Sequence, residues 1–280
     1  MAYLEDNRGR SSEEYMITSQ KGSPRPIWTH LERRLSLLIL AFMLIVWEWL
    51  IRSGAISPLF FPAPTAILRT LGRWLTSDEM FPHLGMTLFR VFLGFALGGL
   101  LGLIVGLIIG WSRRISVVVD PFIAATHPIP KIAILPLIML VFGIGEISKL
   151  ILIAIVAFFP MLINTAAGVR QINPVYFQVV ESYGASPIRV FARIVIPGCL
   201  PLILTGVRLS LNISLLITIV VELVAAQRGL GTLIWSAWQT LRTEELYASL
   251  VIAAALGVSL NFLLQYVQKR MIPWELGEKG

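Results

Sequence analysis

Long apolar runs, rather than short alternating ones, set the pattern of this chain. Each run is close to the roughly 20 residues that a helix needs to cross the hydrocarbon of a bilayer. Apolar and polar positions do not alternate within the runs, which favours helices over the strands of a closed barrel. The pattern predicts an all-α integral membrane protein with six transmembrane helices, at about residues 35–51, 87–111, 117–142, 149–167, 200–225 and 248–267.

The composition supports a membrane protein and gives it an orientation. Hydrophobic residues make up 56% of the chain and charged residues 14%, against about 25% charged in a typical soluble domain. With the N-terminus inside, the inner segments carry about twice as many Lys and Arg residues as the outer ones. Both termini are therefore predicted to be cytoplasmic. The net charge of +7 comes without a basic groove interleaved with aromatic residues, so no nucleic-acid partner is expected.

The ends of the chain are polar. We expect a cytoplasmic N-terminal tail over 1–34, a transmembrane domain over 35–270 and a cytoplasmic C-terminal tail over 271–280. The N-terminal tail lacks the basic region followed by an apolar region that marks a cleaved signal peptide. Cys199 is the single cysteine and the three histidines are widely spaced, so no disulfide framework, metal site or cofactor is expected.

Five glycines recur at every fourth position of the second run. They are Gly94, Gly98, Gly102, Gly106 and Gly110. Small residues at this spacing form a stripe where another helix can approach closely, because helix association in lipid depends on van der Waals packing. The stripe predicts helix packing within the bundle, with a surface that slides during function as the alternative.

The connection over about 171–197 carries strong helix signals on the predicted cytoplasmic side. Asn173 and Pro174 can begin a helix that Gly184 ends, and Ser186 and Pro187 can begin a second helix that stops before Pro197. Most connections in helical bundles are 2–8 residues long. A structured hairpin of this size indicates a docking surface.

This hairpin resembles the EAA loop of permease subunits in bacterial ABC importers. Gly184 and Ala185 are followed, after the family's gap, by Ile194-Val195-Ile196-Pro197. Gln178 stands where the family has its glutamate, and Glu181 lies nearby but at another position. Further stretches resemble the subgroup for nitrate, sulfonates, taurine or bicarbonate, namely 62–67, 88–98, 127–149, 163–170 and 204–211.

The resemblance implies a type I importer permease fold in a bacterial inner membrane. It implies a permease homodimer, two cytoplasmic ATPase subunits and an external solute-binding protein, periplasmic or lipid-anchored. The loop would be the coupling helix that sits in a groove of the ATPase, and transport would proceed by alternating access. The ATPase-coupling residues carried over in this way are Gln178, Glu181, Gly184, Ala185, Ser186, Pro187, Arg189, Arg193 and Pro197.

The chain is not expected to be an enzyme. A P-loop needs Gly-Lys followed by Ser or Thr, and no lysine in this sequence follows a glycine. ATP hydrolysis would therefore belong to a separate subunit. Clustered nucleophiles, acids or metal ligands, which a membrane enzyme requires, are missing from the sequence pattern. An ion-coupled secondary transporter is the alternative, although it usually has two broken-helix repeats.

Polar residues inside the predicted spans are candidates for a translocation pathway, since ionisable groups are costly in lipid. Broken backbone at membrane depth is tolerated where it is buried or lines a cavity. For Lys131 the alternative is snorkelling to the surface, for the hydroxyls interhelical bonding, and for Glu222 an ion pair such as one with Arg90. The candidates are His127, Pro130, Lys131, Asn164, Arg208, Asn212, Ser214, Thr218 and Glu222.

The substrate is the least defined part of the interpretation. The subgroup implies a small anion such as a sulfonate, taurine, nitrate or bicarbonate. Related permeases with thiamine or riboflavin precursors as substrates are the alternative. Selectivity in this architecture resides mostly in the external binding protein.

Overall fold

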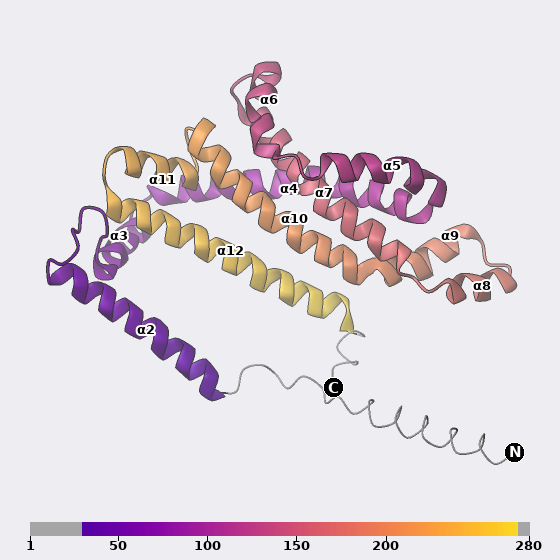
Figure 1. Cartoon of the computed structure of the whole chain (residues 1–280), viewed down its shortest axis with the longest axis horizontal. Coiled ribbons are helices and arrows are strands. Elements are labelled where there is room, and N and C mark those ends of the chain that lie inside the picture. Colours follow the sequence, from indigo (N-terminus) through magenta and orange to yellow (C-terminus); the bar gives the residue numbers. More distant parts are fainter. Residues whose placement is uncertain (1–29, 274–280) are drawn as a thin grey trace, which may run out of the picture.

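The structure, a computed structural model, describes residues 30–273, and its elements within this range are helices. The predicted tails at 1–29 and 274–280 lie outside the described residues. Figure 1 shows the helices arranged as a bundle with one hairpin projecting from an end. The α-helices are α2 (His30–Arg52), α3 (Pro64–Thr76), α4 (Met80–Trp111), α5 (Arg113–Thr126), α6 (Leu135–Phe142), α7 (Glu146–Arg170), α8 (Pro174–Ser182), α9 (Pro187–Val190), α10 (Ile196–Ala225), α11 (Leu230–Gln239) and α12 (Thr243–Met271). A 3₁₀-helix η1 (Lys131–Ile134) precedes α6, and a π-helical segment η2 (Phe191–Val195) joins α9 to α10.

The six predicted runs correspond to helices of the structure. Five helical segments of the described chain are long and apolar enough to cross a membrane, namely Arg34–Arg52, Met80–Trp111, Glu146–Arg170, Pro187–Ala225 and Thr243–Met271. The third run forms Arg113–Thr126 and Lys131–Phe142, which are bent by 83°. Pro128 and Pro130 lie at this break, where the missing N–H groups interrupt helical bonding. The all-α prediction is confirmed, and six spans result when the bent pair counts as one.

The centre of the bundle is formed by α4, α7 and α10, which pack along one another. Five glycines of α4 face α7, and at each of them an added Cβ would collide with α7. At Gly102 it would lie 2.5 Å from the carbonyl oxygen of Phe158, and at Gly106 2.7 Å from that of Leu162. Close backbone approach of this kind is how helices associate in lipid. The glycine stripe therefore lets α4 and α7 pack almost backbone to backbone.

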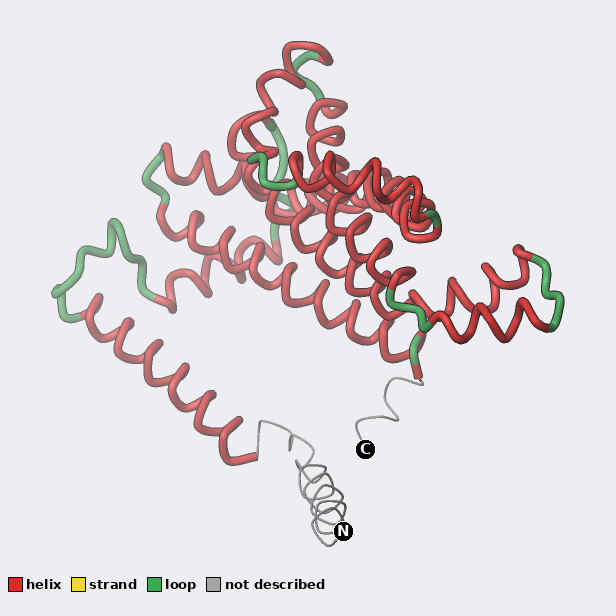
Figure 2. The backbone as a smooth tube through the Cα atoms, turned by 45° about the vertical axis from the view of Figure 1, so that its right-hand side comes forward, coloured by secondary structure: helices red, strands yellow, loops and turns green. Residues whose placement is uncertain are grey.

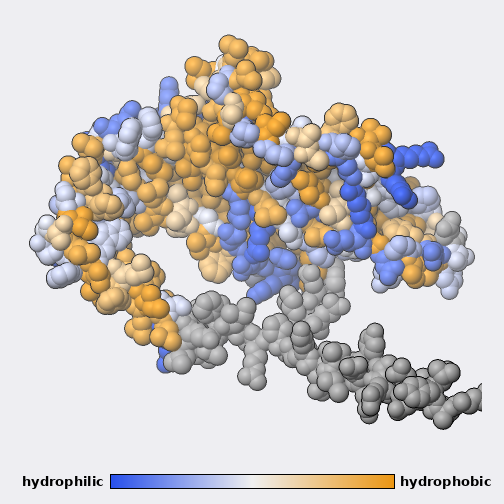
Figure 3. Space-filling view, in the orientation of Figure 1, coloured by the Kyte–Doolittle hydropathy of each residue, from blue (hydrophilic) through white to orange (hydrophobic). Residues whose placement is uncertain are grey.

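Apolar side chains cover much of the bundle's surface, as expected for a lipid-facing protein. Figure 3 shows these side chains over the visible face of the helices and along α2. The helix α2 stands away from the bundle along most of its length in Figures 1 and 2 and contacts it near its C-terminal end, through α3 and through Trp47, whose ring lies 6.0 Å from that of Tyr247 in α12. Many of its large apolar residues are exposed, among them Leu38, Phe42, Ile45 and Trp49.

One predicted helix boundary is wrong. We expected the second helix of the hairpin to stop before Pro197, yet the helical chain runs from Pro187 through the π-helical segment into α10. In the π segment the N–H of Ile196 donates to the carbonyl of Phe191. Pro197 lies directly after the π-helical segment, so its missing N–H falls where the bonding changes from the π to the α pattern. The hairpin is thus continuous with a membrane-spanning helix.

Candidate functional site

The hairpin of α8 and α9 projects from the end of the bundle where α7 ends and α10 begins (Figure 2). Oδ1 of Asn173 accepts a hydrogen bond from the N–H of Val175 at 3.0 Å and begins α8. Gly184 ends the turn with φ +65°, and the N–H of Ala185 donates to Val180 at 3.1 Å. Ser186 precedes Pro187 in extended backbone, but its side chain makes no capping bond. Start and end of α8 thus follow the chemistry expected from the sequence.

The tip of the hairpin exposes apolar side chains. Tyr183 is 86% exposed and Ile188 82% exposed. Gln178, Ser186, Pro187, Arg189 and Arg193 are also exposed, Ala185 and Pro197 are half-buried, and the side chain of Glu181 lies outside the described part. Exposed aromatic and aliphatic groups beside arginines are typical of a protein interaction surface.

The base of the hairpin is attached to the last residue of α4. The ring of Trp111 makes edge-on contacts with Phe177 of α8, at 6.1 Å between centroids, and with Phe191 of the π segment, at 5.8 Å. Such aromatic pairs contribute about 0.5–1.5 kcal/mol beyond area burial. Val195 and Cys199, which pack in one apolar cluster with Phe177 and Phe191, are fully buried. Sequence reasoning missed Trp111, because no local pattern reveals a contact with residues so distant in the chain.

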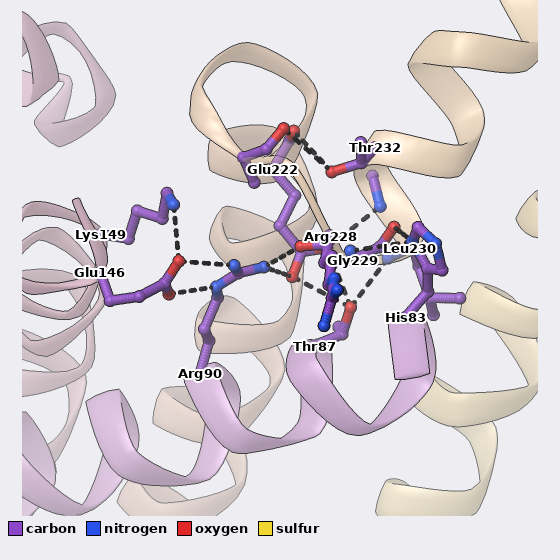
Figure 4. A network of polar contacts seen from close by, with 12 residues as sticks. His83, Thr87, Arg90, Glu146, Lys149, Glu222, Arg228, Gly229, Leu230 and Thr232 are labelled. Atoms are coloured by element: carbon purple, nitrogen blue, oxygen red, sulfur yellow. Dashed lines mark hydrogen bonds and ion pairs between the residues drawn. The ribbon is translucent and has the colours of Figure 1, made fainter. Parts of the chain in front are cut away.

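A buried ion-pair cluster lies at the opposite end of α4 and is drawn in Figure 4. Arg90 is 1% exposed and donates from Nε and Nη2 to both carboxylate oxygens of Glu146, at 2.7 and 2.8 Å. Its Nη1 donates to Glu222 at 2.6 Å and to the carbonyl of Arg228 at 2.5 Å. Lys149 adds a 2.7 Å contact to Glu146. We define these residues, Arg90, Glu146, Lys149 and Glu222, as the outer cluster.

The loop before α11 encloses Glu222. The carboxylate accepts bonds from Oγ1 of Thr87 at 2.9 Å and from the N–H of Gly231 at 3.0 Å. Thr87 in turn accepts from the N–H of Leu230 at 2.9 Å. Gly229 has φ +143°, and a Cβ there would collide with the carboxylate of Glu222. Together with Arg90, these donors fix the position and orientation of the buried carboxylate.

Other predicted pathway residues lie in separate places. The face of α10 that carries Glu222 also carries Ser214 and Thr218, both fully buried; Ser214 donates to the carbonyl of Ser210 at 2.7 Å. Asn212 bonds Asn261 of α12 at 3.2 Å, and Asn164 donates to the carbonyl of Pro160 at 2.8 Å. Arg208 is half-buried.

The candidates of the third run form a different group. His127 and Pro130 are exposed, and His127 packs edge-on to Phe159 at 6.0 Å between ring centroids. Lys131 donates to the carbonyl of His127 and lies 4.5 Å from the centre of the Phe159 ring. The structure therefore does not gather all the candidates into one site. It does bring Glu222 to Arg90, the pairing considered from the sequence.

Comparison with known proteins identifies the family to which this chain belongs. The model of the family "Binding-protein-dependent transport system inner membrane component" matches residues 98–274. The chain belongs to this family. It is the transmembrane permease subunit of an ABC importer, a transport subunit whose ATPase is a separate polypeptide. The permease is thus a multi-pass membrane protein that works with ATPase and solute-binding partners.

Individual relatives cover most of the permease. The putative aliphatic sulfonates transport permease protein SsuC of Bacillus subtilis is 33% identical, over 87% of this chain and 88% of that protein. The taurine transport system permease protein TauC of Escherichia coli K12 is 35% identical, over 92% of this chain and 97% of that protein.

A solved structure shows the same fold. The permease resembles an inward-facing structure of the MetNI methionine ABC transporter with a TM-score of 0.60 and 18% identity, over 70% of this chain and 99% of that one. This likeness confirms the predicted type I importer permease fold.

Proposed function

We propose that the permease imports a small sulfonate, either taurine or an aliphatic sulfonate. The observation that carries this proposal is the identity of 33–35% to sulfonate and taurine permeases along almost the whole chain. Nitrate, bicarbonate and vitamin precursors are the alternative substrates. The sulfonate group is a permanent anion, and the exposed Arg228, which lines the cavity beside the outer cluster, is compatible with its passage.

The hairpin of α8 and α9 is the proposed docking site for the ATPase. Its exposed apolar tip and its continuity with α10 support this role, because a force on the tip acts directly on a membrane-spanning helix. The residues proposed to form the contact or to shape it are Gln178, Glu181, Gly184, Ala185, Ser186, Pro187, Arg189, Arg193 and Pro197. Gln178 is neutral where the family has a glutamate, so its contact would be a hydrogen bond without an ion pair.

The proposed assembly is a permease homodimer with two ATPases, an external binding protein and both termini in the cytoplasm. In this orientation the hairpin faces inward and the outer cluster faces outward. The proposed pathway runs past the polar face of α10, with Ser214, Thr218 and Glu222. The excess of Lys and Arg on the predicted inner segments supports the orientation.

Transport assays test the substrate. The permease is reconstituted with its own ATPase and binding protein in proteoliposomes, and uptake of labelled taurine, an alkanesulfonate, nitrate, bicarbonate and thiamine is compared. We expect ATP-dependent uptake of a sulfonate to exceed that of the other solutes. Preference for nitrate, bicarbonate or thiamine would overturn the substrate, and uptake by the permease alone on an ion gradient would overturn the ABC role.

A further inference from the structure

The outer cluster joins three helices at one end of the bundle. Arg90 belongs to α4, Glu146 is the first residue of α7, and Glu222 lies near the end of α10. One guanidinium therefore holds the outer ends of α7 and α10 together (Figure 4). A fork of two parallel bonds between arginine and a carboxylate fixes both distance and orientation.

The two arms of this clamp differ in their access to water. Glu222 is fully buried and takes further bonds from Thr87 and Gly231. The side chain of Glu146 is 39% exposed and, in the described structure, its bonds are to Arg90 and Lys149. Water can replace the bonds of an exposed carboxylate but not those of a buried one. The arm to Glu146 is thus the arm that can open while the other persists.

The connector between α6 and α7 immediately precedes Glu146. Gly143 has φ +81° and Gly145 follows it after Ile144, so two glycines stand between α6 and α7. No atom of the described residues, apart from the chain neighbours, lies within 4 Å of a Cβ added at either glycine. Small residues in a short connector between helices are common at hinges. Oγ of Ser148 in α7 also donates to the carbonyl of Gly143, so the connector and the first turn of α7 are joined and would move together when Glu146 is released.

A cavity lies against the same residues. Its volume is about 540 Å³, and it is lined by Arg90, Glu146 and Lys149 together with Ile144, Val224 and Arg228. The space adjoins both the hinge and the end of α10. The beginning of α7 and the end of α10 thus border an open volume on the side where solute enters in the proposed orientation.

We propose that Arg90 is the positioning residue of an outer gate, and that its bond to Glu146 is the latch. With the latch closed, as in the structure, α7 and α10 are held together at their outer ends. Breaking the arm to Glu146 separates them and opens the polar face of α10 to the exterior. The proposal rests on the orientation given under the proposed function and on no particular substrate.

Labelling of a buried cysteine tests the gate directly. Thr218 is fully buried one helical turn from Glu222, and its hydroxyl has no partner among the described residues. Thr218→Cys therefore removes no hydrogen bond of the described structure. A membrane-impermeant maleimide is added to intact cells that express the full transporter. The parent chain, with the buried Cys199 as its single cysteine, gives the background.

We expect Thr218→Cys to react slowly in the otherwise native chain and about tenfold faster when it is combined with Glu146→Gln, which removes the charge of the latch. Lys149→Gln should give a smaller increase, because Lys149 contacts only Glu146 in the cluster. The matched control is Glu245→Gln, which breaks an ion pair with Arg242 at the same end of the bundle. This control should leave the labelling rate unchanged.

ATP hydrolysis gives a second readout that a merely structural role would not raise. In the reconstituted complex, Glu146→Gln should increase hydrolysis in the absence of the binding protein, whereas Glu245→Gln should not. Unchanged labelling and hydrolysis, or only a loss of assembled complex, would overturn the gate. Gated labelling in a transporter that imports no sulfonate would support the gate and overturn only the proposed substrate.

Discussion

Gly98→Ala is expected to destabilise the permease by about 1–3 kcal/mol, the usual cost of inserting a group into a packed interior. The added Cβ would overlap the backbone carbonyl of Ala154 in α7. A backbone carbonyl cannot rotate away as a side chain can, so the two helices have to separate. Because α4 and α7 form the centre of the bundle, larger substitutions such as Gly98→Leu should abolish folded protein.

Gly85→Ala is the matched control, since it makes the same change in the same helix. Within residues 30–273, no atom beyond the helix's own backbone lies within 4 Å of a Cβ at Gly85, and alanine is a better helix former by about 1 kcal/mol. The control should therefore be neutral or stabilising. Thermal unfolding of the detergent-purified permease measures both variants. Equal melting temperatures for the two would contradict backbone packing along the glycine stripe.

Gly184→Val is expected to reduce ATP-driven uptake by more than about tenfold while the permease still inserts into the membrane. A side chain at φ +65° is strained by roughly 1–2 kcal/mol, and more for a β-branched residue. Among the described residues, none outside its chain neighbours lies within 4 Å of a Cβ added at Gly184. The strain therefore changes the tip of the hairpin, which is the proposed ATPase contact, and leaves the bundle intact.

Gly54→Val introduces the same strain elsewhere. Gly54 has φ +76° and equally open surroundings, but it lies in the loop between α2 and α3. Uptake in proteoliposomes should remain close to the native rate in this variant. If both variants lose uptake to the same extent, general strain rather than the hairpin explains the loss.

The sequence predicted those features that depend on local chemistry. The six apolar runs, the start of α8 at Asn173 and Pro174, and the turn at Gly184 all follow from residue types at short spacing. The length of the hairpin and its match to the family loop also identified the ABC importer. Hydropathy and helix capping act within a few residues, so one sequence is enough to predict them.

Long-range contacts were beyond this kind of reasoning. The 83° bend in the third run depends on how its two halves pack, and the prolines indicate only that a break occurs. Trp111 meets Phe177 and Phe191 because α4 ends beside the base of the hairpin. Glu146 accepts two hydrogen bonds from Arg90, yet it was not among the residues that the sequence suggested for the pathway. Its position just before a predicted span was the one available signal.

The permease therefore has a continuous connection between its two ends. The last residue of α4 contacts the hairpin, the glycine stripe holds α4 against α7, and Arg90 of the same helix joins the outer ends of α7 and α10. A displacement of the hairpin would act on α4 through Trp111 and on α10 through the continuous chain. This arrangement supports the coupling of an ATPase on one side to a gate on the other.

Photo-crosslinking from the hairpin tests the central claim most directly. A photoreactive amino acid is placed at Ile188, 82% exposed at the tip of the hairpin, or at Ile144, 81% exposed at the opposite end of the bundle. The assembled transporter is irradiated in membranes, and the adducts are identified by mass spectrometry. The account predicts an adduct with the ATPase from position 188 and none from position 144. An ATPase adduct from position 144, or only lipid adducts from position 188, would contradict it.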